Sequence, residues 1–358
     1  MHYAANMEEQ SYEFDAEEVA KLGIVLHHIN IERSPYVFTH NTRAFLQLVK
    51  IVRQNDIKLV HCHTPVGGVL GRLVGIWCRK NNVKVIYTAH GFHFYQGAPL
   101  KNNTLYYIVE KFFARFTDVL IVINDEDYIS AKGLRLRRGG RVCKIPGVGL
   151  DVEKFQPLTA DERQAKRKEL GIGEDEYFLV SVGELNENKN HMVVLRALSR
   201  MKQDKHRLNN IKYGICGSGF YKDNMPVWIK QLQLEDTVEL FGYRHDVAEI
   251  VGCADAFIFP SIREGLGMAA LEALAMGIPV IASDNRGTRE YMQHKNNGYV
   301  CHCHDIDGFV KGIEYIHDLN EYDRERTRSC CRQSVRSFDK RRTNKIMERI
   351  YERLEEGM

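Results

Sequence analysis

One stretch of the sequence decides the fold: it runs from Phe257 to Ser283 and reads FIFPSIREGLGMAALEALAMGIPVIAS. It opens with a continuous apolar run that ends at Pro260, as expected of a strand that is buried on both faces. A loop with two glycines follows. The Ala-, Leu- and Met-rich segment after this loop predicts a helix from about Met268 to Gly277. A second apolar run closes the stretch, so the order strand, loop, helix and strand predicts one unit of a parallel sheet.

The same alternation extends over the rest of the chain. Short apolar runs alternate with helical stretches, and polar or glycine-containing turns separate them. This pattern predicts an α/β protein whose parallel sheets are covered on both faces. The expected strands are Gly23–Ile29, Lys58–His61, Lys84–Thr88, Val119–Ile123, Arg141–Ile145, Phe178–Val182, Lys212–Cys216, Val238–Phe241, Ala256–Phe259 and Val280–Ser283.

The alternation is interrupted in the segment Pro146–Pro157, which contains two prolines, two glycines and no helical period. Such a segment is typical of a linker between domains. We therefore expect an N-terminal domain over residues 1–148, a C-terminal domain over 149–335 and a C-terminal helix over 336–358. Two doubly wound, Rossmann-like domains that face a cleft would place ligands at the carboxyl ends of their strands, inside that cleft.

The composition narrows the function classes. The chain has 358 residues, 44% of them hydrophobic, which is enough for two domains with their own cores. The formal charge of +3 is too small to predict nucleic acid as the main partner. No apolar run approaches the ~20 residues of a membrane span, and the N-terminus lacks the basic and apolar regions of a signal peptide. The nine cysteines therefore predict reduced thiols in a cytoplasmic protein.

The loop before the helix at Met268 predicts an anion site that two carboxylates flank. The first N–H groups of a helix are unpaired and carry the positive end of its dipole, so they suit a pyrophosphate. Glu264 precedes the helix, and Glu272 lies just over one turn inside it. Carboxylates beside a phosphate suggest ligand hydroxyls and developing positive charge, both of which a sugar nucleotide supplies. The alternative is that Glu264 is an N-terminal helix charge and Glu272 a solvated surface residue.

A second alternative is a dinucleotide site. The residues Gly265-Leu-Gly-Met-Ala-Ala270 fit the G-x-G-x-x-A fingerprint, and Asp284 lies roughly 20 residues further on. In that fingerprint the first glycine ends the strand directly, whereas Ser261–Glu264 intervene here. We therefore weigh an NAD-binding oxidoreductase below an enzyme that uses a sugar nucleotide.

Glu264 and Glu272 are spaced as E-x7-E, and this motif resembles that of family 4, or group 1, glycosyltransferases, which have the two-domain GT-B fold. Further segments of the second half agree with this resemblance. They are Val182–Lys189 (VGELNENK), Cys216–Gly219 (CGSG), Phe241–Asp246 (FGYRHD) and Ser283–Glu290 (SDNRGTRE). In the first half, His61–Gly68 (HCHTPVGG) and Tyr87–Tyr95 (YTAHGFHFY) resemble the capsular and exopolysaccharide branch of the family.

The resemblance implies a role for each residue of a donor site. Lys189 would pair with the donor phosphates, and Gly267 and Met268 would offer backbone N–H groups to the distal phosphate. Glu264 would hold hydroxyls of the transferred sugar, and Glu272 would hold those of the ribose.

Further positions follow from the same motifs. The backbone near Tyr243 would contact the base. His90 would reach the transferring sugar from the opposite domain, so His90 and Glu264 are the expected catalytic residues. The remaining expected donor-binding positions are Gly217, Gly265 and Leu266.

By this resemblance the protein is a retaining hexosyl- or N-acetylhexosaminyl-transferase that uses a nucleotide sugar, expected to be UDP-linked. The acceptor would be a saccharide or a polyprenyl-linked saccharide, and the product a surface polysaccharide. We expect neither a metal nor another cofactor, because Lys189 and the helix dipole can stabilise the departing nucleoside diphosphate. The alternative is a truncated homologue that binds nucleotide without turnover.

The sequence departs from the family pattern at two places. Glu184 stands where the family usually has an arginine that binds phosphate, and Arg244 and Arg263 are the candidates to replace it. The chain also starts at His2–Asn6, which resembles the end of the family's second strand, so we expect the first βα unit to be missing. A doubly wound sheet without its first strand would expose unpaired strand edges.

Two other segments each have a structural and a functional interpretation. Cys301–His304 resembles metal-ligand spacing, but no second Cys/His pair lies at zinc-finger distance, so a strand or loop edge is preferred. Lys132–Arg141 is basic and follows an aromatic helix whose spacing favours core packing. The functional alternative is peripheral contact with anionic lipid at the inner face of the membrane.

Overall fold

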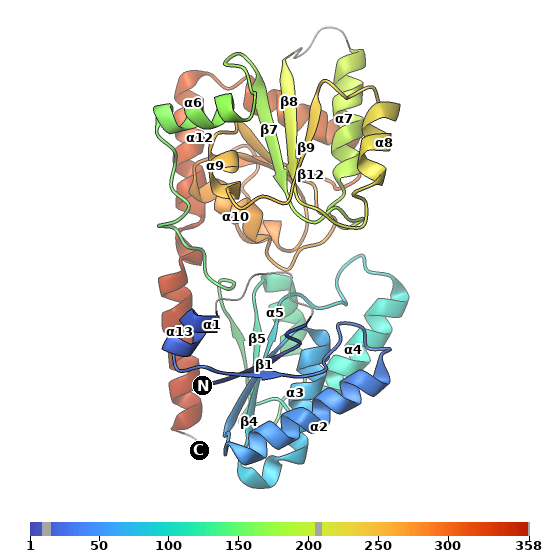
Figure 1. The fold of residues 1–358 in the computed structure, drawn as a ribbon, viewed down its shortest axis with the longest axis vertical. Coiled ribbons are helices and arrows are strands. Elements are labelled where there is room, and N and C mark those ends of the chain that lie inside the picture. Colours follow the sequence, from blue (N-terminus) through green and yellow to red (C-terminus); the bar gives the residue numbers. More distant parts are fainter. Residues whose placement is uncertain (9–15, 205–209, 357–358) are drawn as a thin grey trace. The chain divides into compact units, whose positions relative to one another are not determined.

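The chain divides into two units, and each is built around parallel β-structure (Figure 1). The computed structural model describes residues 1–8, 16–204 and 210–356. Unit 1 comprises Met1–Ile145 and Glu348–Met358, and unit 2 comprises Pro146–Met347. The division falls at the first residue of the expected linker, and the long helix α13 (Lys340–Glu355) contributes residues to both units.

Unit 1 contains two separate parallel sheets within the described part of the chain. The larger sheet has the strand order β3-β4-β5-β6, and the smaller one consists of β1 paired with β2. The strands are β1 (His2–Ala5), β2 (Val25–His28), β3 (Leu59–His63), β4 (Lys84–Ala89), β5 (Val119–Val122) and β6 (Arg141–Lys144). The helices are α1 (Ala16–Lys21), α2 (Phe38–Gln54), α3 (Pro65–Trp77), α4 (Leu100–Ala114) and α5 (Asp125–Lys132).

A buried ion pair joins α3 to α4 in unit 1. Arg72 Nη1 lies 2.6 Å from Glu110 Oε2, and the two side chains are only 1% and 9% exposed. The guanidinium carbon of Arg72 also lies 4.2 Å from the centroid of the Tyr87 ring on β4. A charge pair without water around it must satisfy its own hydrogen bonds, and the two-point contact between these groups does so.

Unit 2 contains a six-stranded parallel sheet with the order β12-β11-β10-β7-β8-β9. Its strands are β7 (Tyr177–Val182), β8 (Ile211–Cys216), β9 (Val238–Gly242), β10 (Ala256–Phe259), β11 (Val280–Ser283) and β12 (Gly298–Cys301). Its helices are α6 (Ala160–Glu169), α7 (His191–Gln203), α8 (Asn224–Gln231), α9 (Val247–Gly252), α10 (Met268–Ala275), α11 (Ile306–His317) and α12 (Glu321–Ser334).

Helices cover both faces of the sheet of unit 2 (Figure 1). On one face, α7, α8 and α11 share a single apolar core with β7, β8, β10 and β11, to which Leu195, Met225 and Phe309 belong. On the other face, α9 contacts β7 and α10 contacts β10. Every residue of β10 is buried, as expected of a strand covered on both sides. The expected α/β class with two Rossmann-like units is confirmed.

Helix α6 was not among the expected elements. It carries a capping box, in which the Thr159 hydroxyl accepts from the Glu162 N–H (3.3 Å) and the Glu162 carboxylate accepts from the Thr159 N–H (2.8 Å). The T-x-x-E signal was therefore present in the sequence. The residues that follow this signal are strongly charged and show no apolar period, so they provide no second indication of a helix. In the structure Arg167 is the one buried residue of α6.

The strand order of unit 2 reverses between β7 and β10. From β7 the chain moves outward through β8 and β9, then returns to β10 on the other side of β7 and moves outward through β11 and β12. In open parallel sheets, the loops at such a reversal leave a crevice that binds ligands. These loops are residues 183–190 and 260–267, and they contain Lys189 and Glu264.

Candidate functional site

Hydrogen bonds join the two loops at the strand reversal of unit 2. The Ile262 N–H donates to the Asn188 carbonyl (2.8 Å), and the Asn188 amide donates to the Arg263 carbonyl (2.9 Å). The first residue of α7, His191, follows three positions later, so this amide connects the start of one helix to the loop before another. Asn188 thereby positions Glu264, a role that the sequence did not reveal although the residue lies in a quoted motif.

Lys189 and Glu264 form an ion pair at the strand reversal of unit 2. Lys189 Nζ lies 2.6 Å from Glu264 Oε1, and the two side chains are 22% and 15% exposed. The same Nζ lies 5.4 Å from the centroid of the Phe259 ring at the end of β10. The structure thus brings together the expected phosphate cation and one expected sugar-binding carboxylate.

Helix α10 begins without a side-chain cap. Its N-cap is Gly267, which has a φ of +93° and cannot provide a capping side chain. A Cβ at this position would lie 2.7 Å from the Phe259 ring and 2.9 Å from the Tyr291 hydroxyl, so glycine is required. The N–H groups of Gly267, Met268 and Ala269 donate to no residue in the described ranges. The start of α10 therefore presents unused donors beside Glu264.

Gly265 and Leu266 complete the loop before α10. Leu266 is buried, and its backbone packs so closely against Gly287 that a Cβ there would lie 2.8 Å from the Leu266 carbonyl oxygen. The Arg286 guanidinium donates from Nε to the Glu264 carbonyl (3.3 Å). The loop after β11 thereby supports the loop that carries Glu264.

Glu272 lies in the second turn of α10 and is half-buried. Among the residues that the structure describes, its carboxylate has no hydrogen-bond or ion-pair partner. Burial raises the pKa of this carboxyl above its ordinary value, and the positive charge of Lys154 opposes the effect. A half-buried carboxylate without a donor costs free energy, so it is well suited to accept hydrogen bonds from a ligand.

Gly217 follows β8 and lies against the loop after β7. Its φ is +146°, and a Cβ there would collide with the Gly183 carbonyl oxygen. The Gly217 N–H donates to the Gly242 carbonyl (2.7 Å) at the end of β9. Position 217, at the carboxyl ends of β7, β8 and β9, therefore has no room for a side chain and requires glycine.

Tyr243 follows β9 and is 61% exposed, whereas its neighbour Arg244 is engaged in an ion pair. Arg244 donates from Nε and Nη2 to the two carboxylate oxygens of Asp246, at 2.7 and 2.5 Å. Hydrogen bonding from Arg244 lowers the pKa of Asp246 well below its ordinary range. This pairing disfavours Arg244 as the replacement for the phosphate-binding arginine, and Glu184 itself is exposed and accepts from the Asn186 amide (3.0 Å).

His90 lies in unit 1, directly after β4, and belongs to a group of three imidazoles. Its Nε2 lies 3.0 Å from Nδ1 of His63, which ends β3. The ring centroids of His63 and His61 lie 4.3 Å apart. His61 in turn lies 2.7 Å from the Tyr351 hydroxyl in α13 and 2.8 Å from the Thr88 hydroxyl. The sequence singled out His90 and assigned no role to its two neighbours.

The imidazoles of this group stay neutral into the acid range. Desolvation, with a further contribution from neighbouring imidazoles, lowers the pKa of His61 to about 3 and that of His63 to about 4. Desolvation also lowers the pKa of His90. The H-x-H spacing on β3 places both side chains of that strand on the same face, and this signal could have revealed the pair.

The segment Cys301–His304 does not form a metal cluster with other described residues. Cys301 ends β12, and Cys303 is buried. Within the described ranges, no three or more His, Cys, Asp or Glu side chains are grouped so that they could hold a metal ion.

Two family models match the chain. Residues 162–330 match the model described as "Glycosyl transferases group 1", and residues 9–124 match the one described as "Glycosyl transferase 4-like". The chain is 40% identical over 323 residues to "Putative glycosyltransferase EpsD" of Bacillus subtilis (strain 168), covering 90% of this chain and 83% of that protein.

One further relative and one solved structure are also similar to this chain. The Escherichia coli "UDP-Gal:alpha-D-GlcNAc-diphosphoundecaprenol alpha-1,3-galactosyltransferase" is 28% identical over 282 residues, covering 77% of this chain and 70% of that one. The solved structure of Anabaena Alr3699/HepE in complex with UDP is similar in fold, with a TM-score of 0.75 at 17% identity. This similarity covers 95% of this chain and 88% of that one.

Proposed function

Since the chain belongs to the group 1 glycosyltransferases, which have the GT-B fold, we propose that it transfers a sugar from a nucleotide sugar to an acceptor hydroxyl. The observation that carries this proposal is the group of charged and polar atoms in the loops after β7 and β10. There Lys189 and Glu264 lie 2.6 Å apart at the strand reversal, beside the unused N–H groups of α10. A cation and a helix N-terminus suit a diphosphate, and a carboxylate suits sugar hydroxyls.

The diphosphate would lie between Lys189 and the N–H groups of Gly267 and Met268. As the bond from the anomeric carbon to the phosphate oxygen breaks, negative charge grows on the leaving diphosphate. The lysine and the positive end of the α10 dipole would stabilise that charge. In this proposal the residues themselves supply the electrostatic stabilisation, so transfer requires no metal ion.

The two carboxylates would recognise the hydroxyl groups of the donor. Glu264 would hold the transferred sugar, and Glu272, which lacks a described partner, would accept hydrogen bonds from the ribose. The base would contact the backbone near Tyr243. We propose UDP as the nucleotide, because the similar Anabaena structure holds UDP and the E. coli relative is named for UDP-galactose.

His90 would reach the transferring sugar, and transfer would retain the anomeric configuration. Both statements rest on the motif around His90 and on the E-x7-E spacing of Glu264 and Glu272. The lowered pKa of His90 supports a neutral imidazole at physiological pH, which donates a hydrogen bond from one nitrogen and accepts one at the other.

We propose a saccharide or a polyprenyl-linked saccharide as the acceptor, in the synthesis of a surface polysaccharide. The E. coli relative is named for a diphosphoundecaprenol acceptor. Helix α4 of unit 1 offers a surface for the lipid, because Leu105, Ile108 and Phe112 are 54%, 56% and 51% exposed. The exposed residues Lys101 and Lys111 lie on the same helix.

This helix face suits the inner, anionic surface of a membrane. Apart from Thr104, its exposed side chains are apolar or cationic, and the acid of α4, Glu110, is buried against Arg72. Within the described residues, no helix is both long and apolar enough to cross a bilayer. Binding to vesicles of phosphatidylglycerol should fall when Lys101 and Lys111 are both changed to Glu. Binding that charge reversal leaves unchanged would refute this contact.

The experiment that tests the function is a donor screen monitored by release of nucleoside diphosphate. UDP-, GDP- and ADP-sugars are offered with lipid-linked and free saccharide acceptors, and calorimetry compares UDP, GDP, ADP and NAD. We expect UDP to bind and a UDP-sugar to turn over. UDP binding without turnover of any sugar would favour the non-catalytic alternative, and retention of NAD without nucleoside diphosphate binding would refute the proposal.

A further inference from the structure

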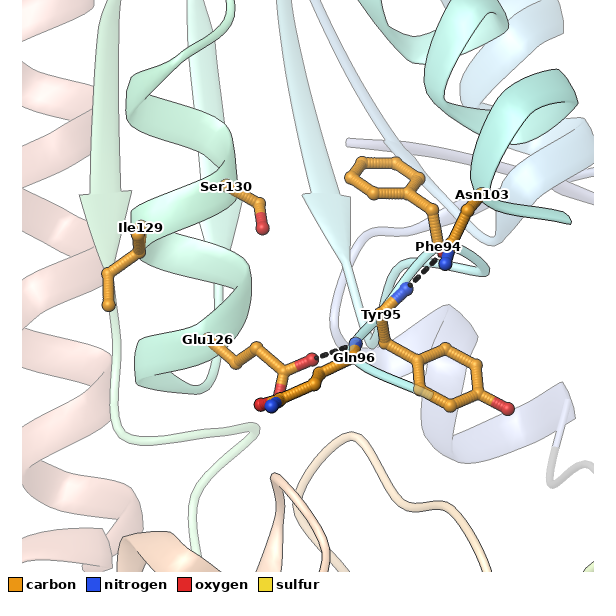
Figure 2. Close-up of a pocket in the computed structure, with 7 residues that line it drawn as sticks. All are labelled: Phe94, Tyr95, Gln96, Asn103, Glu126, Ile129 and Ser130. Atoms are coloured by element: carbon orange, nitrogen blue, oxygen red, sulfur yellow. Dashed lines mark hydrogen bonds between the residues drawn. The ribbon is translucent and has the colours of Figure 1, made fainter. Parts of the chain in front are cut away.

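A cavity of about 330 Å³ opens in unit 1, and none of the motif roles above accounts for it. Figure 2 shows its walls. Glu126 and Ser130 project from α5 toward Phe94 and Gln96 in the loop after β4, whereas the ring of Tyr95 points away from α5. The remaining lining residues are Asn103 of α4 and Ile129 of α5.

The cavity is held open by hydrogen bonds between its own walls. The Gln96 N–H donates to Glu126 Oε1 (2.9 Å), and the Tyr95 N–H donates to Asn103 Oδ1 (2.9 Å). The Asn103 amide donates in turn to the Ala98 carbonyl (3.2 Å). Two helices thereby fix the loop through its backbone N–H groups, and these bonds leave the side-chain amide of Gln96 unused.

Two polar groups at this cavity are unused. The side-chain amide of Gln96 and the hydroxyl of Ser130 make no hydrogen bond to any residue within the described ranges. Phe94 adds an aromatic ring to the same lining, and Ile129 of this lining is 72% exposed. Apolar surface combined with a few convergent polar groups is typical of small-molecule sites.

The charges of the lining select the class of ligand. The seven lining residues include no Lys, Arg or His, and Glu126 is their single acid. Such a lining repels phosphate and other anions, whereas a carboxylate, an amide and a hydroxyl can bind a ligand rich in hydroxyl groups. The volume lies at the small end of ordinary ligand pockets, which span about 300–1,000 Å³, so it suits a sugar ring better than a long chain.

The position of the cavity connects it to the reaction. Strands β4 and β5 are neighbours in the parallel sheet, and the cavity is formed by the segments that follow their carboxyl ends. His90 lies at the same edge, directly after β4. Asn103 belongs to α4, the helix whose exposed apolar face we assign to lipid.

We propose that this cavity binds a neutral sugar ring of the acceptor, with Phe94 against the ring and Gln96, Ser130 and Glu126 toward its hydroxyls. This inference rests on the proposed transferase function and extends it from the donor to the acceptor. The diphosphate of a lipid-linked acceptor would lie outside the cavity, because the lining offers it no cation.

The test uses saturation-transfer NMR on the full chain with methyl glycosides of glucose, galactose, N-acetylglucosamine and N-acetylgalactosamine. Saturating UDP is present, and the series is repeated on Glu264→Ala without UDP, so that a sugar held in unit 2 is not counted. Ser130→Tyr fills the cavity. Gln96→Ala removes an exposed side-chain amide but keeps the backbone N–H of residue 96, which donates to the Glu126 carboxylate. Leu46→Ala, at an exposed position of α2, is the matched control.

We expect at least one glycoside to bind, both cavity variants to weaken its binding at least tenfold, and Leu46→Ala to leave it unchanged. Inorganic phosphate should not compete. The proposal is overturned if none of the glycosides binds, if phosphate displaces a bound one, or if binding is the same in Gln96→Ala as in the wild type. Circular dichroism verifies that Ser130→Tyr folds, and Gln96→Ala decides the outcome if it does not.

The donor and acceptor proposals can fail separately. A chain that binds a glycoside in the cavity but does not bind UDP would refute the donor assignment and leave the cavity assignment intact. A chain that turns over a UDP-sugar with the same acceptor KM in wild type and Gln96→Ala would refute the cavity assignment alone.

Discussion

His63 Nδ1 and His90 Nε2 lie 3.0 Å apart, so one imidazole donates a hydrogen bond to the other. Because both rings are neutral near pH 7, this bond restricts which nitrogen of His90 carries its proton. If His90 acts on the donor sugar, His63 is a positioning residue for it. The two side chains come from neighbouring strands, β3 and β4, which are paired in parallel.

We expect His63→Ala to lower kcat by roughly fivefold, which corresponds to the loss of one hydrogen bond of about 1 kcal/mol. The KM for the donor should stay unchanged, since His63 belongs to unit 1 and the donor residues to unit 2. His63→Gln keeps a hydrogen-bonding side chain and should restore part of the rate. Equal kcat values in wild type and His63→Ala would contradict this role.

The Lys189–Glu264 pair predicts that one substitution strengthens the binding of UDP and slows the turnover of a UDP-sugar. A phosphate must compete with Glu264 for the lysine, so Glu264→Gln should tighten the binding of UDP alone by roughly fivefold, equivalent to about 1 kcal/mol for a partly exposed pair. The same variant should lower kcat for the UDP-sugar, because a sugar-binding carboxylate is lost. Calorimetry and steady-state rates measure the two effects.

Lys189→Met is the matched variant for this pair. It removes the cation and should weaken UDP binding by at least tenfold, since about 1.4 kcal/mol corresponds to that factor. If UDP binds equally to Lys189→Met and the wild type, the lysine does not contact the phosphates.

We expect Glu272 to lower the stability of unit 2 and to strengthen the binding of UDP. Its pKa is raised in the folded protein, so the unfolded chain releases this proton at lower pH, and the associated stability is lost as the pH rises through the folded pKa. Glu272→Gln should therefore raise the melting temperature of unit 2 at pH 7. It should also weaken UDP binding, because an amide is a poorer acceptor for ribose hydroxyls than a carboxylate. A variant that binds UDP as the wild type does would remove the ribose assignment.

The histidine group should make unit 1 sensitive to acid. His61 and His63 protonate at about 3 and about 4 in the folded protein and at the ordinary 6.5 when unfolded. The unfolded chain therefore binds more protons between these values, and the free energy of unfolding should fall as the pH decreases from about 6.5 toward about 4. Urea titrations of Trp228→Phe, followed through Trp77, report on unit 1.

His61→Gln provides the control for this pH dependence. It removes one of the depressed groups and should flatten the decline in unfolding free energy between pH 6.5 and 4. A wild-type curve that is level over this range would contradict the assignment.

The buried pair of Arg72 and Glu110 should be the costliest polar site to break in unit 1. Glu110→Gln leaves a buried guanidinium without its counter-charge, and we expect a loss of about 3–5 kcal/mol in unfolding free energy. Asp56→Asn, which breaks the exposed contact to Lys58, should change it by less than about 1 kcal/mol. Similar losses in the two variants would contradict the prediction.

The sequence predicted the parallel sheet and the start of α10 because both depend on local patterns. β10 is apolar at every residue, and Gly267 precedes an Ala- and Leu-rich helix. The common edge of the loops after β7 and β10 followed from the same evidence, since the loops after parallel strands lie at one edge of a sheet.

Contacts between distant loops could not be predicted. Lys189 and Glu264 are 75 positions apart, and only the reversal of strand order between β7 and β10 brings them within 2.6 Å. Even the pairing of the near neighbours Arg244 and Asp246 involves a distant residue. Lys166 of α6 also contacts the Asp246 carboxylate, at 3.0 Å. A sequence pattern shows which residue types are present, whereas their partners depend on tertiary packing.

Helix α13 determines the order in which the units can be completed during synthesis. Tyr351 contacts His61, and the Ile350 carbonyl accepts from Arg141 (3.3 Å), so the last turns of this helix belong to unit 1. These residues leave the ribosome only after all of Pro146–Met347 has been made. Unit 2 can therefore fold during translation as a continuous segment, whereas unit 1 gains the contacts of Ile350 and Tyr351 only after that segment has been made.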